Sequence, residues 1–165
     1  MRTMLVNAAL LAMSVLAISV PPAEAQDRVK RGEYLVGIMD CTGCHTPGAL
    51  IGKPDQALSL SGSDIGFAIP ELGVFYPPNL TPDRETGIGE WSESAIVAAV
   101  RTGVTPSGRI LAPVMPYHSY GRLTDADAQA VAAYLKSLKP VRHKVPAPAG
   151  PSEKPTAPYL TLAVP

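Results

Sequence analysis

The chain is poor in cysteine and in aromatic residues, and it carries no net charge. Only two of its 165 residues are cysteines, so a framework of several disulfides cannot hold the fold together. Phe, Trp and Tyr make up 5% of the chain, which leaves little aromatic material for a core. Fourteen basic residues balance fourteen acidic ones, and this lack of a basic surplus argues against a nucleic-acid partner. The sequence contains no internal repeat.

Both cysteines lie in one motif, Cys41-Thr42-Gly43-Cys44-His45. Cys-x-x-Cys-His is the attachment signature of a c-type haem. The two thiols can each form a thioether to one of the two vinyl groups of haem, and His45 can then offer an imidazole nitrogen to the iron. Because the motif occurs once and uses every cysteine, the sequence predicts one covalently attached haem c.

Two other interpretations of this motif stay open. A redox dithiol of the thioredoxin type also contains Cys-x-x-Cys, but it accompanies a βαβ pattern, which does not surround residue 41. A structural zinc site needs four ligands, usually as two separated pairs, and only His118 and His143 follow the motif. Covalent haem also accounts for the composition, because a large flat macrocycle can fill the centre of an aromatic-poor core.

The N-terminus has the pattern of a secretory signal peptide. Arg2 precedes an apolar run over residues 4–20, Pro21-Pro22 follow it, and Ala23-Glu24-Ala25 supplies small residues for cleavage. We therefore expect residues 1–25 to be cleaved and the mature protein to reside in the periplasm. An uncleaved membrane anchor is the alternative, but the apolar run is near the short limit of roughly 20 residues for a bilayer span. No stable membrane span is expected.

Three segments of the mature chain have helical patterns. Apolar residues within 27–40 recur at helical spacing and predict a helix that leads into the haem motif. A second helix is predicted to begin after Ser92, a favourable N-cap, and to end at Gly103. A third is predicted to begin after Thr124 and to stop at Pro140. The haem domain is accordingly assigned to residues 26–142.

Long irregular stretches separate these helices. Residues 46–83 are dense in Gly, Pro, Ser and Asn, and we expect them to wrap around the haem edge, with short extended pieces at 48–52 and 73–76. Residues 143–165 form a Pro-rich C-terminal tail, since seven prolines lie from 140 to 165. Whether its apolar stretch 159–162 folds back, docks on a partner or stays disordered is open at this point.

If His45 binds the haem iron from one face, a second ligand is expected on the opposite face. Removal of the signal leaves two methionines, Met39 and Met115. Met39 is tied to the histidine side by its nearness to the motif, and we expect it to pack in the core. Met115 lies 70 residues beyond His45, in a loop that flanking prolines stiffen, which lowers the entropic cost of holding a weak ligand. His45 and Met115 are therefore the predicted metal ligands, with ligation by His118 or an open site as alternatives.

Several further motifs carry a family resemblance: Asn79-Leu80-Thr81-Pro82-Asp83, Thr86-Gly87-Ile88-Gly89, Trp91-Ser92, Gly108-Arg109 and Leu123-Thr124-Asp125-Ala126-Asp127. Together with the haem motif and the Met115 loop, they resemble a class I c-type cytochrome. More narrowly, they resemble the haem domains of the cytochrome c subunits of periplasmic alcohol and gluconate dehydrogenases. The likeness covers about residues 28–142. It implies an all-α, class I cytochrome c fold, with short helices and long loops wrapped around one covalent haem.

The resemblance also implies roles for individual residues. It places haem attachment at the two cysteines and axial ligation at the histidine and methionine named above. Trp91, Asn79 and Arg109 match positions near the haem propionates, where an indole N–H, an amide and a guanidinium can all donate to a carboxylate. Gly32 and Tyr134 are expected to meet where the first and last helices cross.

These features predict an electron carrier rather than an enzyme. Iron with both axial positions filled has no place for a substrate, so the protein is expected to move single electrons. A periplasmic dehydrogenase is the expected donor, and another cytochrome or a terminal oxidase the expected acceptor. A dedicated electron-transfer subunit of a multi-subunit dehydrogenase is one alternative. A peroxidase or gas-binding haem protein that loses Met115 from the iron is the other.

Overall fold

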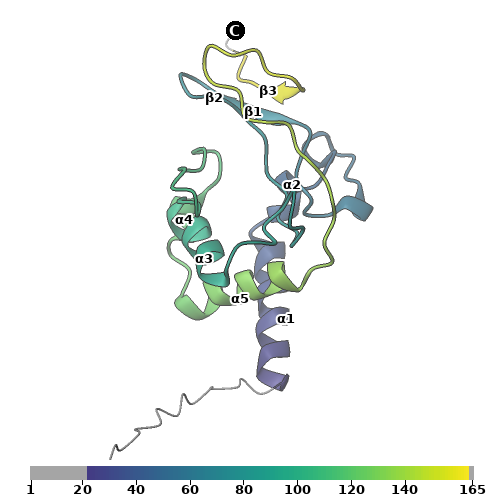
Figure 1. Ribbon diagram of the computed structural model, residues 1–165, viewed down its shortest axis with the longest axis vertical. Coiled ribbons are helices and arrows are strands. Elements are labelled where there is room, and N and C mark those ends of the chain that lie inside the picture. Colours follow the sequence, from purple (N-terminus) through teal and green to yellow (C-terminus); the bar gives the residue numbers. More distant parts are fainter. Residues whose placement is uncertain (1–21, 164–165) are drawn as a thin grey trace, which may run out of the picture.

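The computed structural model describes residues 22–163 (Figure 1). Most of the predicted signal peptide, residues 1–25, therefore lies outside the described residues, and its cleavage stays a prediction. Its last four residues begin helix α1, Pro22–Ile38. No helix within residues 22–163 is long and apolar enough to cross a membrane.

Helix α1 begins earlier than the predicted 27–40 because proline suits the first position of a helix, where no N–H bond is required. It ends at Ile38, and the chain then turns at Asp40, whose φ of 53° is in the left-handed region. Asp tolerates this conformation better than most residues. The turn leads directly into the one-turn helix α2, Cys41–His45, which carries the haem motif.

Three more helices follow: α3 (Glu93–Thr102), α4 (Tyr117–Tyr120) and α5 (Asp125–Ser137). The predicted N-caps of α3 and α5 are confirmed. Ser92 Oγ accepts a hydrogen bond from the Ala95 N–H at 3.1 Å, and Thr124 Oγ1 accepts one from the Asp127 N–H at 3.1 Å. The short helix α4, just after Met115, was not predicted.

The main core lies where α1 crosses α5, with α3 packed alongside (Figure 1). Alanines line much of the buried face of α5 and let α1 approach closely. The predicted meeting of Gly32 and Tyr134 is confirmed, because a Cβ on Gly32 would lie 2.7 Å from the Cβ of Tyr134 and still closer to the Ala130 carbonyl oxygen. The three helices contribute Leu35, Val36, Ile96, Val131 and Leu135 to this core, and the chain between α2 and α3 adds Leu60 and Ile88.

The long stretch between α2 and α3 contains two short 3-10 helices and a hairpin: η1 (Ala49–Ile51), η2 (Gln56–Leu58), β1 (Gly66–Ile69) and β2 (Gly73–Phe75). The prediction of an extended piece at 73–76 is confirmed by β2. The one at 48–52 was wrong. Gly48 and Gly52 have φ values of +74° and +71°, and these left-handed residues curl the chain into the single turn η1.

The C-terminal tail folds back on this hairpin. Strand β3, Tyr159–Leu160, runs parallel to β1, which gives a three-stranded sheet in the order β2-β1-β3. On the other edge Ala149 forms an antiparallel bridge with Val74 of β2. The Tyr76 hydroxyl donates a hydrogen bond to the Ala157 carbonyl at 2.7 Å. The domain remains mostly helical, as a class I cytochrome c fold requires, and the small sheet is an addition to the predicted all-α class.

The α1–α5 crossing yields a stability prediction. Gly32→Ala should cost about 3 kcal/mol of overpacking, because its methyl group meets the backbone of α5, and should regain about 1 kcal/mol of helix propensity. The net loss of unfolding free energy is about 2 kcal/mol, measurable by denaturant unfolding followed by circular dichroism. Gly37→Ala is the control, because, beyond the adjacent backbone of its own helix, no atom of residues 22–163 lies within 4 Å of its new methyl group. A Gly32→Ala protein as stable as the Gly37→Ala protein would contradict this packing.

Candidate haem site

Helix α2 presents the two thiols of the haem motif together. Cys41 and Cys44 lie three positions apart and so share one face of the helical turn. Both are free and half-buried. Gly43, between them, has no Cβ, and one placed there would lie 2.7 Å from Oδ1 of Asp40. The small residue therefore leaves room for the carboxylate that starts the turn.

The environment of these thiols weighs on the competing interpretations of the motif. Burial, and then the nearby negative charge of Asp40, raise the pKa of Cys41 to about 11 and shift the pKa of Cys44 in the same direction. A redox-active dithiol depends on a lowered thiol pKa, which is the opposite shift. A zinc site would need further ligands, and among residues 22–163 no group of three or more His, Cys, Asp or Glu side chains is arranged to hold a metal ion.

His45 is buried and held in one orientation. The residue is 6% exposed, and its ring Nδ1 lies 2.7 Å from the Pro78 carbonyl oxygen. A carbonyl can only accept, so Nδ1 carries the proton and Nε2 keeps a free lone pair. Burial lowers the pKa of His45, and the bond to Pro78 opposes that shift. A neutral imidazole whose second nitrogen is fixed by a carbonyl is the usual form of a histidine metal ligand.

Met115 lies two residues before α4, in a loop anchored to the end of α3. The Leu111 N–H donates to the Gly103 carbonyl at 2.8 Å, and the Met115 N–H donates to the Ala112 carbonyl at 2.9 Å. The ring of Tyr117 packs over Gly103, where an added Cβ would lie 2.9 Å from it. Met115 itself is half-buried. The loop is thus held at both ends by contacts with other residues of the chain.

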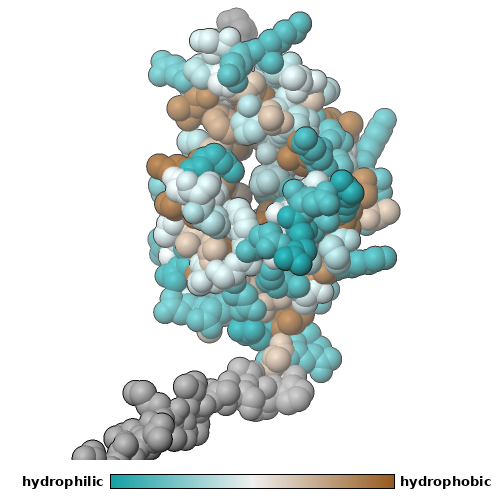
Figure 2. Space-filling model, in the orientation of Figure 1, coloured by the Kyte–Doolittle hydropathy of each residue, from teal (hydrophilic) through white to brown (hydrophobic). Residues whose placement is uncertain are grey.

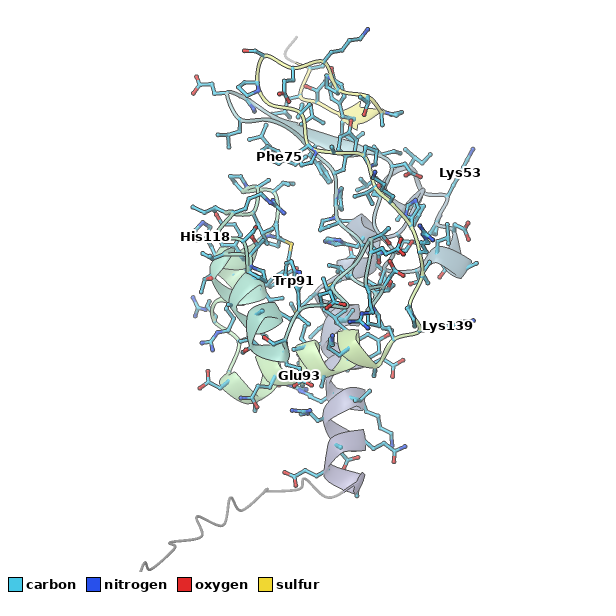
Figure 3. All side chains as sticks on the ribbon, in the orientation of Figure 1. Lys53, Phe75, Trp91, Glu93, His118 and Lys139 are labelled. Atoms are coloured by element: carbon cyan, nitrogen blue, oxygen red, sulfur yellow. The ribbon has the colours of Figure 1, made fainter. Side chains whose placement is uncertain are left out.

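The two sides face each other across a hollow. In Figure 1, α2 lies on one side of the molecule and α4, which closely follows Met115, lies on the other. The space-filling view shows the surface hollowed between them (Figure 2). Trp91 lies between the two sides (Figure 3). Two thiols and a correctly protonated imidazole on one side, with a thioether on the other, are the donor set that haem c takes, so these residues fit the group.

The remaining candidate ligands occupy different environments. His118 is exposed on α4, with its ring centroid 4.3 Å from that of Tyr117 (Figure 3). Met39 is half-buried and packs against the main core, which confirms its expected role. The Met39 carbonyl also accepts a hydrogen bond from the Tyr120 hydroxyl at 2.8 Å. The assignment of Met115 rather than His118 to the iron stays a prediction.

Trp91 and Arg109 are two of the three residues predicted to contact propionates. Their side chains form no hydrogen bond to other described residues. Trp91 is half-buried against the main core, and only its backbone forms hydrogen bonds within residues 22–163. Arg109 is exposed in the turn after α3, where its carbonyl accepts bonds from the N–H and hydroxyl of Thr105. Their contacts with propionates stay predictions.

Asn79, the third, is 1% exposed and lies at the centre of a polar network. Its Nδ2 donates to Thr86 Oγ1 at 3.1 Å and to the Val141 carbonyl at 2.8 Å. Its Oδ1 accepts from the N–H and the hydroxyl of Thr81 at 2.9 and 2.8 Å. Both amide hydrogens are therefore engaged, and the predicted bond to a propionate requires one of these contacts to be exchanged.

Sequence reasoning missed two residues that hold the site together. Pro78 supplies the carbonyl that fixes the orientation of His45. The Pro77-Pro78 pair was a usable signal of a loop here, because such a pair cannot join the interior of a helix or a central strand. Tyr120 links α4 to the turn before α2, and no sequence pattern marks it. Its closeness to the motif is visible in its pKa, which burial and then the charges of Cys41 and Cys44 raise to about 12.

Comparison with known proteins shows the family to which the chain is similar. The cytochrome c family profile matches residues 29–139. The cytochrome c subunit of quinone alcohol dehydrogenase from Gluconobacter oxydans is 37% identical over 142 residues, 83% of this chain and 28% of its own length. The cytochrome c subunit of gluconate 2-dehydrogenase from Pantoea cypripedii is 42% identical over 107 residues, 65% of this chain and 22% of its own length. A nicotinate dehydrogenase subunit from Pseudomonas putida is 41% identical over 120 residues, 72% of this chain and 9% of its own length.

The chain thus spans less than a third of the length of these relatives. The match nevertheless covers both the helix that bears Cys41-Thr42-Gly43-Cys44-His45 and the loop that bears Met115. By its profile match over most of the domain and by its similarity to these subunits, the chain belongs to the cytochrome c family.

Proposed function

We propose that this protein is a periplasmic mono-haem cytochrome c that carries single electrons from a dehydrogenase to another cytochrome or a terminal oxidase. The observation that carries the proposal is the state of His45, whose Nδ1 is bound to the Pro78 carbonyl and whose Nε2 is left free. The single haem motif supports one haem. The relatives named above, which are subunits of dehydrogenases, support a dehydrogenase as the electron donor.

The residues of this chain would each contribute a distinct part of the work. When bound, haem supplies an iron that gains and loses one electron. Cys41 and Cys44 would hold the group through two thioethers, and His45 would present a lone pair that needs no proton loss. The Met115 loop is anchored by hydrogen bonds of its own, so little ordering entropy would oppose its weak thioether contact. Because His45 and Met115 would both hold the iron, neither residue would have to be exchanged when an electron arrives.

A second candidate is a dedicated subunit of a multi-subunit dehydrogenase. The observation in its favour is that the alcohol and gluconate dehydrogenase relatives are themselves described as cytochrome c subunits. Affinity purification of the tagged full-length protein from its source organism separates the two. Stoichiometric recovery of a catalytic dehydrogenase subunit that persists through gel filtration supports the subunit, and recovery of the cytochrome alone supports the free carrier.

Electron delivery tests the donor directly. Oxidised purified protein is mixed with the periplasmic fraction of the source organism and with ethanol, gluconate or nicotinate, and haem reduction is followed in the visible spectrum. We expect one of these substrates to reduce the protein, and boiled fraction or omitted substrate to leave it oxidised. Reduction by ascorbate in the same mixture shows that the haem is competent. A haem that ascorbate reduces, but that no oxidisable substrate reduces in the presence of the fraction, would contradict the proposed donor.

Replacing the distal ligand tests the coordination. Met115→Ala should remove the thioether-to-iron charge-transfer band and convert part of the iron to the high-spin state, while haem stays attached. The reduction potential should fall by on the order of 0.1 V, a fraction of the roughly 0.8 V range that axial ligands span. His118→Ala is the matched control, three residues away and exposed, and should leave spectrum and potential unchanged. The reverse pattern would assign the iron to His118.

Removing the thiols tests covalent attachment. The double variant Cys41→Ala, Cys44→Ala should give a protein without haem staining after denaturing electrophoresis, because no thioether can form. Either single variant should still stain, since one thioether survives denaturation. Thr42→Ala, inside the same motif, is the control for nonspecific effects on α2 and should stain fully. Staining of the double variant would show that the group is held in another way.

A further inference from the structure

The chain immediately after α5 runs as an extended segment with two different faces. Val141, His143 and Val145 are half-buried, whereas Arg142 and Lys144 are exposed. This alternation is that of an extended chain with one face on a surface. We call residues 141–145 the proximal clamp, because its inner face touches both loops that surround His45.

The first contact of the proximal clamp is with the loop that carries Pro78. Asn79 Nδ2 donates to the Val141 carbonyl at 2.8 Å, and the Val141 N–H donates to Thr81 Oγ1 at 3.1 Å. The His143 N–H donates to Thr86 Oγ1 at 3.1 Å. Asn79 is the residue directly after Pro78. The clamp therefore holds the peptide next to the carbonyl that orients His45.

The second contact is with residues 60–64. His143 Nδ1 donates to the Ser61 carbonyl at 2.9 Å, and His143 Nε2 lies 3.3 Å from Oδ1 of Asp64. The His143 side chain is 19% exposed, and Ser61 is completely buried. A methyl group of Val145 packs against Gly62, whose φ of +100° and missing Cβ leave it room.

Residues 60–64 in turn hold the backbone on both sides of the hydrogen bond between His45 and Pro78. The Gly62 N–H donates to the His45 carbonyl at 2.8 Å, and the Ser63 N–H donates to the Pro77 carbonyl at 3.0 Å. One short segment thus fixes the backbone of His45 on one side and the backbone before Pro78 on the other. A residue that holds this segment controls the distance between the imidazole and its acceptor.

We propose that the proximal clamp positions the axial histidine, and that His143 is its principal positioning residue. The inference rests on the proposed role of His45 as an iron ligand. A carbonyl acceptor on Nδ1–H increases the electron donation of the imidazole, and this favours oxidised iron. Loosening the clamp weakens that hydrogen bond, and the reduction potential rises. The C-terminal tail therefore belongs to the haem site, although it follows the last helix of the domain.

The test compares three variants of the haem-loaded protein. His143→Ala removes the bond to Ser61 and should raise the reduction potential, with the thioether band of Met115 intact. His143→Asn places an amide nitrogen near the position of Nδ1, keeps a donor for Ser61, and should retain the parent potential. Arg142→Ala is the matched control, since Arg142 is exposed in the same segment and its guanidinium pairs with Glu85 at 2.7 Å.

The asparagine variant separates positioning from charge. Asn and Ala both abolish any positive charge of His143 next to Asp64, so an electrostatic effect would shift both variants equally and downward. A positioning effect shifts the alanine variant alone and upward. Equal downward shifts overturn the proposal, and so does an unchanged potential in the His143→Ala protein.

Hydrogen exchange gives a readout that does not depend on electron transfer. The amides of Gly62 and Ser63 should exchange faster in the His143→Ala protein and at the parent rate in the other two variants, as measured by mass spectrometry of the peptide that covers 60–64. Should His143→Ala fail to fold, Val145→Ala loosens the same contact without leaving a buried carbonyl unpaired. It should show the same changes at smaller amplitude, and parental exchange and potential would overturn the proposal.

The outcome also separates this inference from the proposed function. A parent protein without haem staining or without a reversible one-electron wave would refute the electron carrier itself. A parent with both, whose potential does not respond to His143→Ala or Val145→Ala, would refute only the positioning role of the clamp.

Discussion

The hydrogen bond from His45 Nδ1 to the Pro78 carbonyl is the interaction on which the site depends. It fixes the tautomer of a buried imidazole and leaves the other nitrogen free to bind iron. It also joins the haem motif to a segment more than thirty residues later in the chain, which has little regular secondary structure of its own. The loops around it are arranged to keep that one acceptor in place.

Those loops are stabilised by buried polar bonds as well as by Leu60 and Ile88, which pack in the main core. Hydrogen bonds join the side chains of Asn79, Thr81 and Thr86 to one another and to the chain after α5. Both the NH₂ group and the carbonyl oxygen of the Asn79 side chain have partners. A fully satisfied polar network in a low-dielectric interior is rigid and specifies one arrangement. Such a network suits a chain with few aromatic residues, because the apolar material is concentrated in the α1–α3–α5 core and in the small core under the sheet.

The distal side is tied to the same framework from another direction. Tyr117 seats the Met115 loop on Gly103, and Tyr120 reaches from α4 to the Met39 carbonyl just before the haem motif. The two proposed axial ligands, His45 and Met115, are therefore carried by elements that contact each other, not by independent loops. This connection limits how far either residue can move, and small movement is what the proposed one-electron exchange would need.

The sequence by itself determined the features that depend on local chemistry: the haem motif and the caps at Ser92 and Thr124. Caps and motifs act over a few neighbouring residues, so their spacing is readable in one dimension. Only the tertiary structure decided the acceptor for His45, the bond of Tyr120 and the return of residues 141–163 onto the domain. These contacts join residues up to about a hundred positions apart, and their partners are backbone carbonyls, which every residue has and no side-chain pattern marks.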